Sequence, residues 1–166
     1  MLRTDCIPVR RRDVLPRPAR LVAAAMLAVA LAFAAGCSSS PQTPSSVVDK
    51  KGVYTTAQAE KMADLTPLGA AAAIATVDGP AQRQNGLTQL RATGGAEGAR
   101  VAELLTKVFP YSMKSVPVSI ERATVDGNDT LLVIEAAPGK TGKLTTRTLW
   151  ILGAQDGHVL DSASFR

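Results

Sequence analysis

The sequence predicts an α+β domain in which N-terminal helices pack on a four-stranded antiparallel meander. From Thr55 to Pro110, capping signals, strong helix formers and apolar residues at helical spacing indicate helices. From residue 116 onward, apolar and branched residues form short runs separated by turn sequences, which is typical of strands. We therefore place a single α+β domain at residues 54–166.

Proline and glycine residues divide the helical part. Thr55 and Gln58 have the spacing of a capping box, which predicts a first helix that extends to about Leu65, before Pro67. Later helical segments are expected at 67–76, at 81–92, and between Gly94-Gly95 and Pro110, the last with Val101, Leu104, Leu105 and Val108 on one face.

The second half predicts four strands, separated by the turn sequences DGND, PGKTG and QDG. The expected ranges are 116–125, 130–137, 143–152 and 158–165. Two of these strands do not alternate, since 131–134 reads LLVI and 149–152 reads LWIL. Continuous apolar runs of this kind predict burial on both faces of the sheet.

These two runs suggest a binding surface. If the helices cover only one face, the other face needs a second copy of the protein, a partner protein or an apolar ligand. The candidate residues for this face are Leu149, Ile151, Leu131 and Val133. The alternative is that they are central strands of a sheet that the domain itself covers.

The first 36 residues have the layout of a cleaved signal peptide. Six arginines and two aspartates give residues 1–20 a charge of +4, and residues 21–35 are an apolar run. This run is shorter than the roughly 20 residues that span a bilayer as a helix. From Cys37 onward, 13 basic residues face 12 acidic residues, so the main argument for nucleic-acid binding is lost.

Ala34-Ala35-Gly36-Cys37 resembles the bacterial lipobox. The resemblance implies cleavage between Gly36 and Cys37, lipid on Cys37, and a protein anchored to a bacterial membrane outside the cytoplasm. Residues 37–53 would then be a tether, because eight of the nine residues in 38–46 are Ser, Thr or Pro. In the leader, Arg11-Arg12 with Val14-Leu15 resembles the twin-arginine export motif.

The closing sequence 150–165, with Trp150-Ile151-Leu152 followed by Asp156-Gly157-His158 and a last strand, resembles the end of a nuclear-transport-factor-2-like domain. The resemblance implies a sheet that curls around the helices into a cone with a pocket. It also implies an outer sheet face that pairs two subunits, so a homodimer through the sheet is one expectation.

Few residues of the domain can carry chemistry. The chain has one histidine, His158, in an expected surface turn, and it has no cysteine after Cys37, so we expect no metal and no cofactor. Acid/base catalysis would need a carboxylate in an apolar pocket, for which Glu121 and Glu135 are the candidates, although the sequence favours an outward strand position for either. We therefore expect a non-catalytic lipoprotein that binds a partner protein or an apolar ligand. The alternative is a small acid/base enzyme of the isomerase or hydrolase type.

Overall fold

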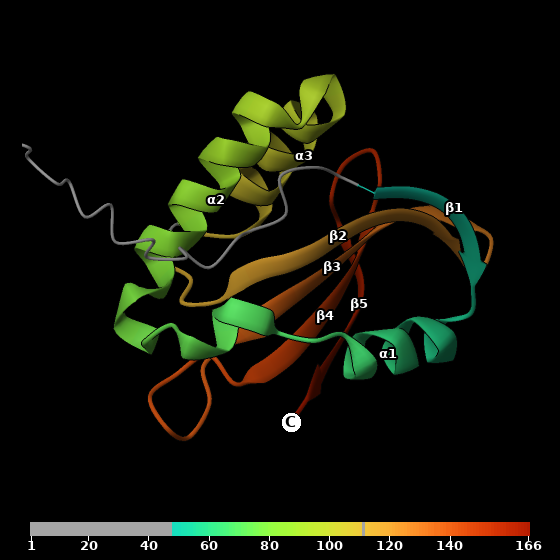
Figure 1. The fold of residues 1–166 in the computed structure, drawn as a ribbon. Coiled ribbons are helices and arrows are strands. Elements are labelled where there is room, and N and C mark those ends of the chain that lie inside the picture. Colours follow the sequence, from blue (N-terminus) through green and yellow to red (C-terminus); the bar gives the residue numbers. More distant parts are fainter. Residues whose placement is uncertain (1–47, 111) are drawn as a thin grey trace, which may run out of the picture. The chain divides into compact units, whose positions relative to one another are not determined.

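Five strands form one mixed sheet in the order β1-β2-β3-β4-β5 (Figure 1). The computed structural model describes residues 48–110 and 112–166, without the side chains of residues 49–51. Strand β1 runs parallel to β2, and the other neighbours are antiparallel. The strands are β1 (Val48–Tyr54), β2 (Val116–Val125), β3 (Asn128–Ala137), β4 (Thr146–Gly153) and β5 (Val159–Phe165).

The α+β class and the β2–β5 meander are confirmed, but the prediction of four strands is incomplete. Residues 48–53, expected to belong to the tether, form most of the edge strand β1. No alternation of apolar residues marks this strand in the sequence VDKKGVY. The strand forms by pairing with β2, in which Val48 lies beside Glu121 and Tyr54 lies beside Val125.

The helices agree with the sequence at three of the four expected positions. They are α1 (Thr56–Leu65), α2 (Gly79–Thr93) and α3 (Gly95–Val108). The helix expected at 67–76 is wrong, because this segment forms the short 3₁₀ turn η1 (Gly69–Ala73) and the start of a second, η2 (Thr76–Asp78). Gly69 has a φ of 53°, a left-handed conformation that interrupts an α-helix.

Helices α2 and α3 cover one face of the sheet (Figure 1). Side chains from both helices pack on Ile120 of β2 and on Leu131 and Val133 of β3. The helix residues of this cluster are Leu87, Leu90, Val101, Ala102, Leu104 and Leu105.

Helix α1 lies on the opposite face of the sheet (Figure 1). Its buried residues, Ala59 and Ala63, belong to a second cluster with side chains of β2, β3 and β4. The strand residues of this cluster are Ala123, Val125, Leu132, Ile134, Leu149 and Ile151. The turn η1 extends the cover with Leu68, Ala71 and Ile74, which pack on Val116, Ala136 and Leu144.

Candidate functional site

The four residues of the predicted binding face are all buried within the single chain. Leu131, Val133 and Leu149 are 0% exposed, and Ile151 is 2% exposed. Leu131 and Val133 lie under α2 and α3. Leu149 and Ile151 lie in the second cluster, which includes Ala59 and Ala63 of α1 and is called the α1 cluster below. The four residues therefore occupy two opposite faces and form no common surface, so an open apolar face over these residues is wrong. Seven of the eight residues in the two runs are buried and Trp150 is half-buried, so the predicted burial on both sides of the sheet is confirmed.

Helix α1 provides the cover, which is the alternative in which the domain itself covers its central strands. Its capping box forms as expected, because the Thr55 side chain accepts from the Gln58 backbone N–H and the Gln58 side chain accepts from Thr55 N. At the same end of the helix, Asp126 Oδ2 accepts from Thr56 N at 3.1 Å and from Thr56 Oγ1 at 2.6 Å. At the other end, Arg147 Nε donates to the carbonyl oxygen of Thr66 at 2.6 Å. Two polar contacts therefore connect the ends of α1 to the sheet.

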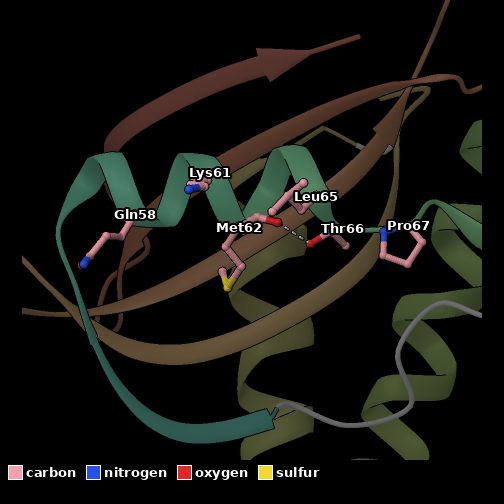
Figure 2. Close-up of a pocket in the computed structure, with 6 residues that line it drawn as sticks. All are labelled: Gln58, Lys61, Met62, Leu65, Thr66 and Pro67. Carbon is pink, nitrogen blue, oxygen red and sulfur yellow. Dashed lines mark hydrogen bonds between the residues drawn. The ribbon is translucent and has the colours of Figure 1, made fainter.

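An open groove of about 500 Å³ follows α1 and the residues after it (Figure 2). Six residues line the groove: Gln58, Lys61, Met62, Leu65, Thr66 and Pro67. Leu65 is 71% exposed and lies next to the apolar side chains of Met62 and Pro67 in this groove. Met62 lines the groove and also packs against the α1 cluster, so the groove adjoins the apolar sheet face.

Apolar groups and one charged side chain line the groove. Met62, Leu65 and Pro67 supply apolar surface, and among the six lining residues Lys61 carries the charge. Ligand sites in proteins commonly combine apolar walls with a few placed polar groups. The groove residues were not predicted. The signal in the sequence was Leu65, which lies off the face formed by Ala59 and Ala63.

Glu135 lies in a buried polar cluster beneath α2 and α3. It is 0% exposed, so the alternative of an outward strand residue is wrong for this carboxylate. Its Oε1 accepts from Arg83 Nη1 at 2.5 Å, and its Oε2 accepts from Ser115 Oγ at 2.6 Å and from Trp150 Nε1 at 3.1 Å. Three donors therefore hold the carboxylate within the apolar core.

Arg83 is the counter-charge that makes this burial possible, and the sequence analysis missed it. It is 2% exposed, lies 5.4 Å from the ring centre of Phe109, and donates from Nη1 to the backbone oxygen of Ser115 at 3.3 Å. Its Nη2 has no hydrogen-bond partner. The signal was its spacing, because Arg83 precedes Leu87 by four residues and Leu90 by seven, and so shares their buried face.

Close packing of the backbone brings Arg83 to this position. Gly79 begins α2 against the carbonyl group of Lys114, where a Cβ atom would collide with the carbonyl oxygen. This approach puts the first turns of α2 beside Ser115 and the start of β2. Trp150 completes the cluster from β4, and its ring lies 5.0 Å from that of Phe109.

Glu121 is also buried, at 3% exposure, so it too is not the outward residue of the alternative. Its Oε1 accepts from Tyr54 Oη at 3.0 Å. Tyr54 packs on the α1 cluster, whereas Glu135 faces α2 and α3. The two candidate catalytic carboxylates are therefore on opposite sides of the sheet and cannot act as a pair on one substrate.

The remaining charged contacts are at the surface. His158 Nδ1 lies 2.6 Å from Asp156 Oδ1 in an exposed turn, as the sequence predicts for this histidine, and this contact lowers the pKa of Asp156. Arg100 donates to both carboxylate oxygens of Glu97, and these hydrogen bonds lower the pKa of Glu97. A smaller hollow of about 170 Å³ lies between Arg100, Lys107 and Asp156.

Comparisons of the chain with models of protein families, with curated proteins and with solved structures found no match. Within residues 48–110 and 112–166, no helix is long and apolar enough to cross a bilayer. In that same part of the chain, no three His, Cys, Asp or Glu side chains are grouped to hold a metal ion. The predicted lipid and cleavage positions, Cys37 and Gly36, and the export residues Arg11 and Arg12 lie outside the described residues.

Proposed function

We propose that this protein is exported, anchored to a membrane by lipid on Cys37, and binds an apolar ligand without transforming it. The observation that carries the proposal is the groove along α1, where the exposed Leu65 lies beside Met62 and Pro67. The proposed location at a membrane outside the cytoplasm rests on the resemblance of residues 34–37 to a lipobox and on the leader before them.

The size and lining of the groove favour a ligand with one apolar chain and an anionic head. A volume of about 500 Å³ is within the range of known ligand sites, roughly 300–1,000 Å³. Lys61 is the charged residue among the six that line the groove, and its ammonium group is the donor that would face a carboxylate or phosphate. Met62 links the groove to aliphatic side chains under α1.

Binding is favoured over catalysis because the buried carboxylates are occupied. A general base needs a lone pair within hydrogen-bond reach of the substrate proton. Both oxygens of Glu135 already accept hydrogen bonds inside the core, and Glu121 accepts from Tyr54. The alternative, a small acid/base enzyme, would require one of these groups to break its contacts.

A nuclear-transport-factor-2-like cone also stays a proposal. Helices α2 and α3, on one face of the antiparallel strands β2–β5, are consistent with it. In such a cone the pocket would lie between α2, α3 and the sheet. That region is filled here by the Glu135 cluster and by leucine side chains, which favours the α1 groove as the ligand site.

The test uses a palmitic acid that carries a photoreactive diazirine in mid-chain, added to isolated membranes that contain the full chain. Adding the probe after membrane isolation prevents its incorporation into the lipid on Cys37. We expect cross-linked peptides that include residues 58–67. Leu65→Ser should lower the yield about tenfold at limiting probe, because burying a leucine contributes roughly 1.5–3 kcal/mol and 1.4 kcal/mol is a factor of ten.

Val77→Ser is the matched control, because Val77 is 80% exposed and does not line the groove. This variant should cross-link like the wild type. Equal yields from Leu65→Ser and the wild type would refute the groove as the ligand site. If the probe labels only a second protein, or a second copy of this chain, bound at α1, the apolar-ligand proposal is refuted and a protein partner takes its place.

A further inference from the structure

Helix α1 covers a large apolar surface with small side chains. The residues that α1 buries are Ala59 and Ala63. Beneath them lie Leu132, Ile134, Leu149 and Ile151, each at most 2% exposed. The sheet face is therefore strongly apolar, whereas the helix contributes two methyl groups and part of Met62 to its cover.

Helix α1 buries less apolar side-chain area than α3 does. Helix α3 buries Val101, Leu104 and Leu105 together with Ala102. Burial stabilises by about 0.8 kcal/mol for each CH₂ group, so alanine side chains contribute much less than leucine side chains. Elements with few buried apolar contacts open locally at a lower free energy than the rest of the fold.

Each end of α1 leaves the helix through one extended residue and is held by polar contacts. Thr55 and Thr66, which flank it, both have extended backbone conformations. The capping box joins Thr55 to Gln58, so it would move with the helix and keep the first turn hydrogen-bonded. Opening would break the contacts of Thr56 with Asp126 and of Arg147 with the Thr66 carbonyl.

We propose that α1 is a detachable cover, and that the apolar chain of the ligand is buried between α1 and the β3–β4 face. This inference rests on the proposed function. It extends that function because an open groove alone would leave the apolar chain of the ligand exposed to water. Ligand sites commonly bury about 70% or more of the ligand's surface. Met62 lines the groove and contacts the cluster below, so the chain would enter there while its anionic head stays near Lys61.

The test compares the labelling of two buried cysteines by a maleimide in membranes that contain the full chain. Ile151→Cys puts a thiol under α1, and Ile120→Cys puts one under α2 and α3; the parent side chains are 2% and 0% exposed. We expect Ile151→Cys to react at least about tenfold faster, which corresponds to an opening that is about 1.4 kcal/mol easier. Oleate should slow the labelling of Ile151→Cys and leave Ile120→Cys unchanged.

A second variant and a label-free measurement support the comparison. Thr56→Val removes the hydroxyl that donates to Asp126, so it should speed the labelling of Ile151→Cys only. Thr148→Val is its control, because Thr148 contacts Ser164 of β5 and lies on the same side of β4 as Trp150, opposite the side that α1 covers. Hydrogen exchange of the wild-type chain should show faster exchange for amides of α1 than for those of α3, without any substitution.

Two results would overturn the inference. Equal labelling rates at the two cysteines, with equal exchange of α1 and α3, would show that α1 is not a cover that opens. Fast labelling at Ile151→Cys that oleate does not slow would show that the chain does not bind beneath α1. A third result separates the two proposals. If the fatty-acid probe does not cross-link to residues 58–67 but Ile151→Cys still reacts faster than Ile120→Cys, the apolar ligand is refuted and the opening of α1 stands.

Discussion

Glu135→Gln should destabilise the domain far more than the same change at an exposed ion pair. The side chains of Glu135 and Arg83 are 0% and 3% exposed, so the substitution leaves a guanidinium group buried without its counter-charge. Removing one partner of a buried ion pair typically costs about 3–5 kcal/mol. A domain of this size has a total stability of about 5–15 kcal/mol, so the loss is a large fraction of it.

The double variant separates charge from packing. Arg83→Met with Glu135→Gln removes both charges and leaves an amide that can still accept from Ser115 or Trp150. We expect this double variant to be more stable than Glu135→Gln alone, since no charge remains buried. Its loss should also be much smaller than the sum of the two single losses.

The assay is urea unfolding of the chain, followed by the fluorescence of Trp150 and by circular dichroism. The tryptophan is the chain's only one, and its Nε1 donates to Glu135, so it reports on this cluster. Glu97→Gln is the control, because the Glu97–Arg100 pair is 40% and 35% exposed and should contribute less than about 1 kcal/mol. Equal losses for Glu135→Gln and Glu97→Gln, or additive losses in the double variant, would refute the assignment of a coupled buried pair.

Three further predictions address the core, a surface pair and the anchor. Ile151→Ser should cost about 2–5 kcal/mol in urea unfolding, comparable with Trp150→Ala, because Ile151 is a core residue; a loss below 1 kcal/mol would contradict this. The hydrogen bonds from Arg100 hold the pKa of Glu97 below its ordinary 4.5, so their small stabilisation is present above that pH and is lost as pH falls through the lowered pKa. Arg100→Met should therefore raise the pKa of Glu97 toward 4.5 in an NMR titration, and an unchanged pKa would assign the shift to another group. Cys37→Ala should abolish lipid labelling, whereas a processed variant that stays on the membrane would refute the lipid anchor.

The elements that the sequence predicted are those with local signals. Helix α1 begins at its capping box, α2 and α3 separate at Gly94-Gly95, and the four strands of the meander follow their turn sequences. Strand β1 has no such signal, because it forms by pairing with β2, from which it is more than 60 residues distant in the chain. The helix expected at 67–76 had alanine-rich composition in its favour, but the left-handed Gly69 interrupts it.

The buried carboxylate could not be predicted from strand period alone. The period gives the direction of Glu135, but it does not show which group meets it. The partner, Arg83, precedes it by 52 residues and belongs to a helix that reaches the sheet only because Gly79 packs closely on Lys114. The strand pattern therefore identified Glu135 as a candidate, but only the tertiary structure shows which groups surround its carboxylate.

The error about the sheet face has a specific physical cause. Continuous apolar runs correctly indicated burial on both sides, but the helices were all assigned to one side. The turns η1 and η2 separate α1 from α2 and α3, and this spacing lets α1 reach the opposite face. Because α1 presents alanines to that face, a large apolar surface is covered by a helix that buries little side-chain area. In the proposed mode of binding, access to this surface depends on the free energy of opening α1, which the labelling rate at Ile151→Cys reports.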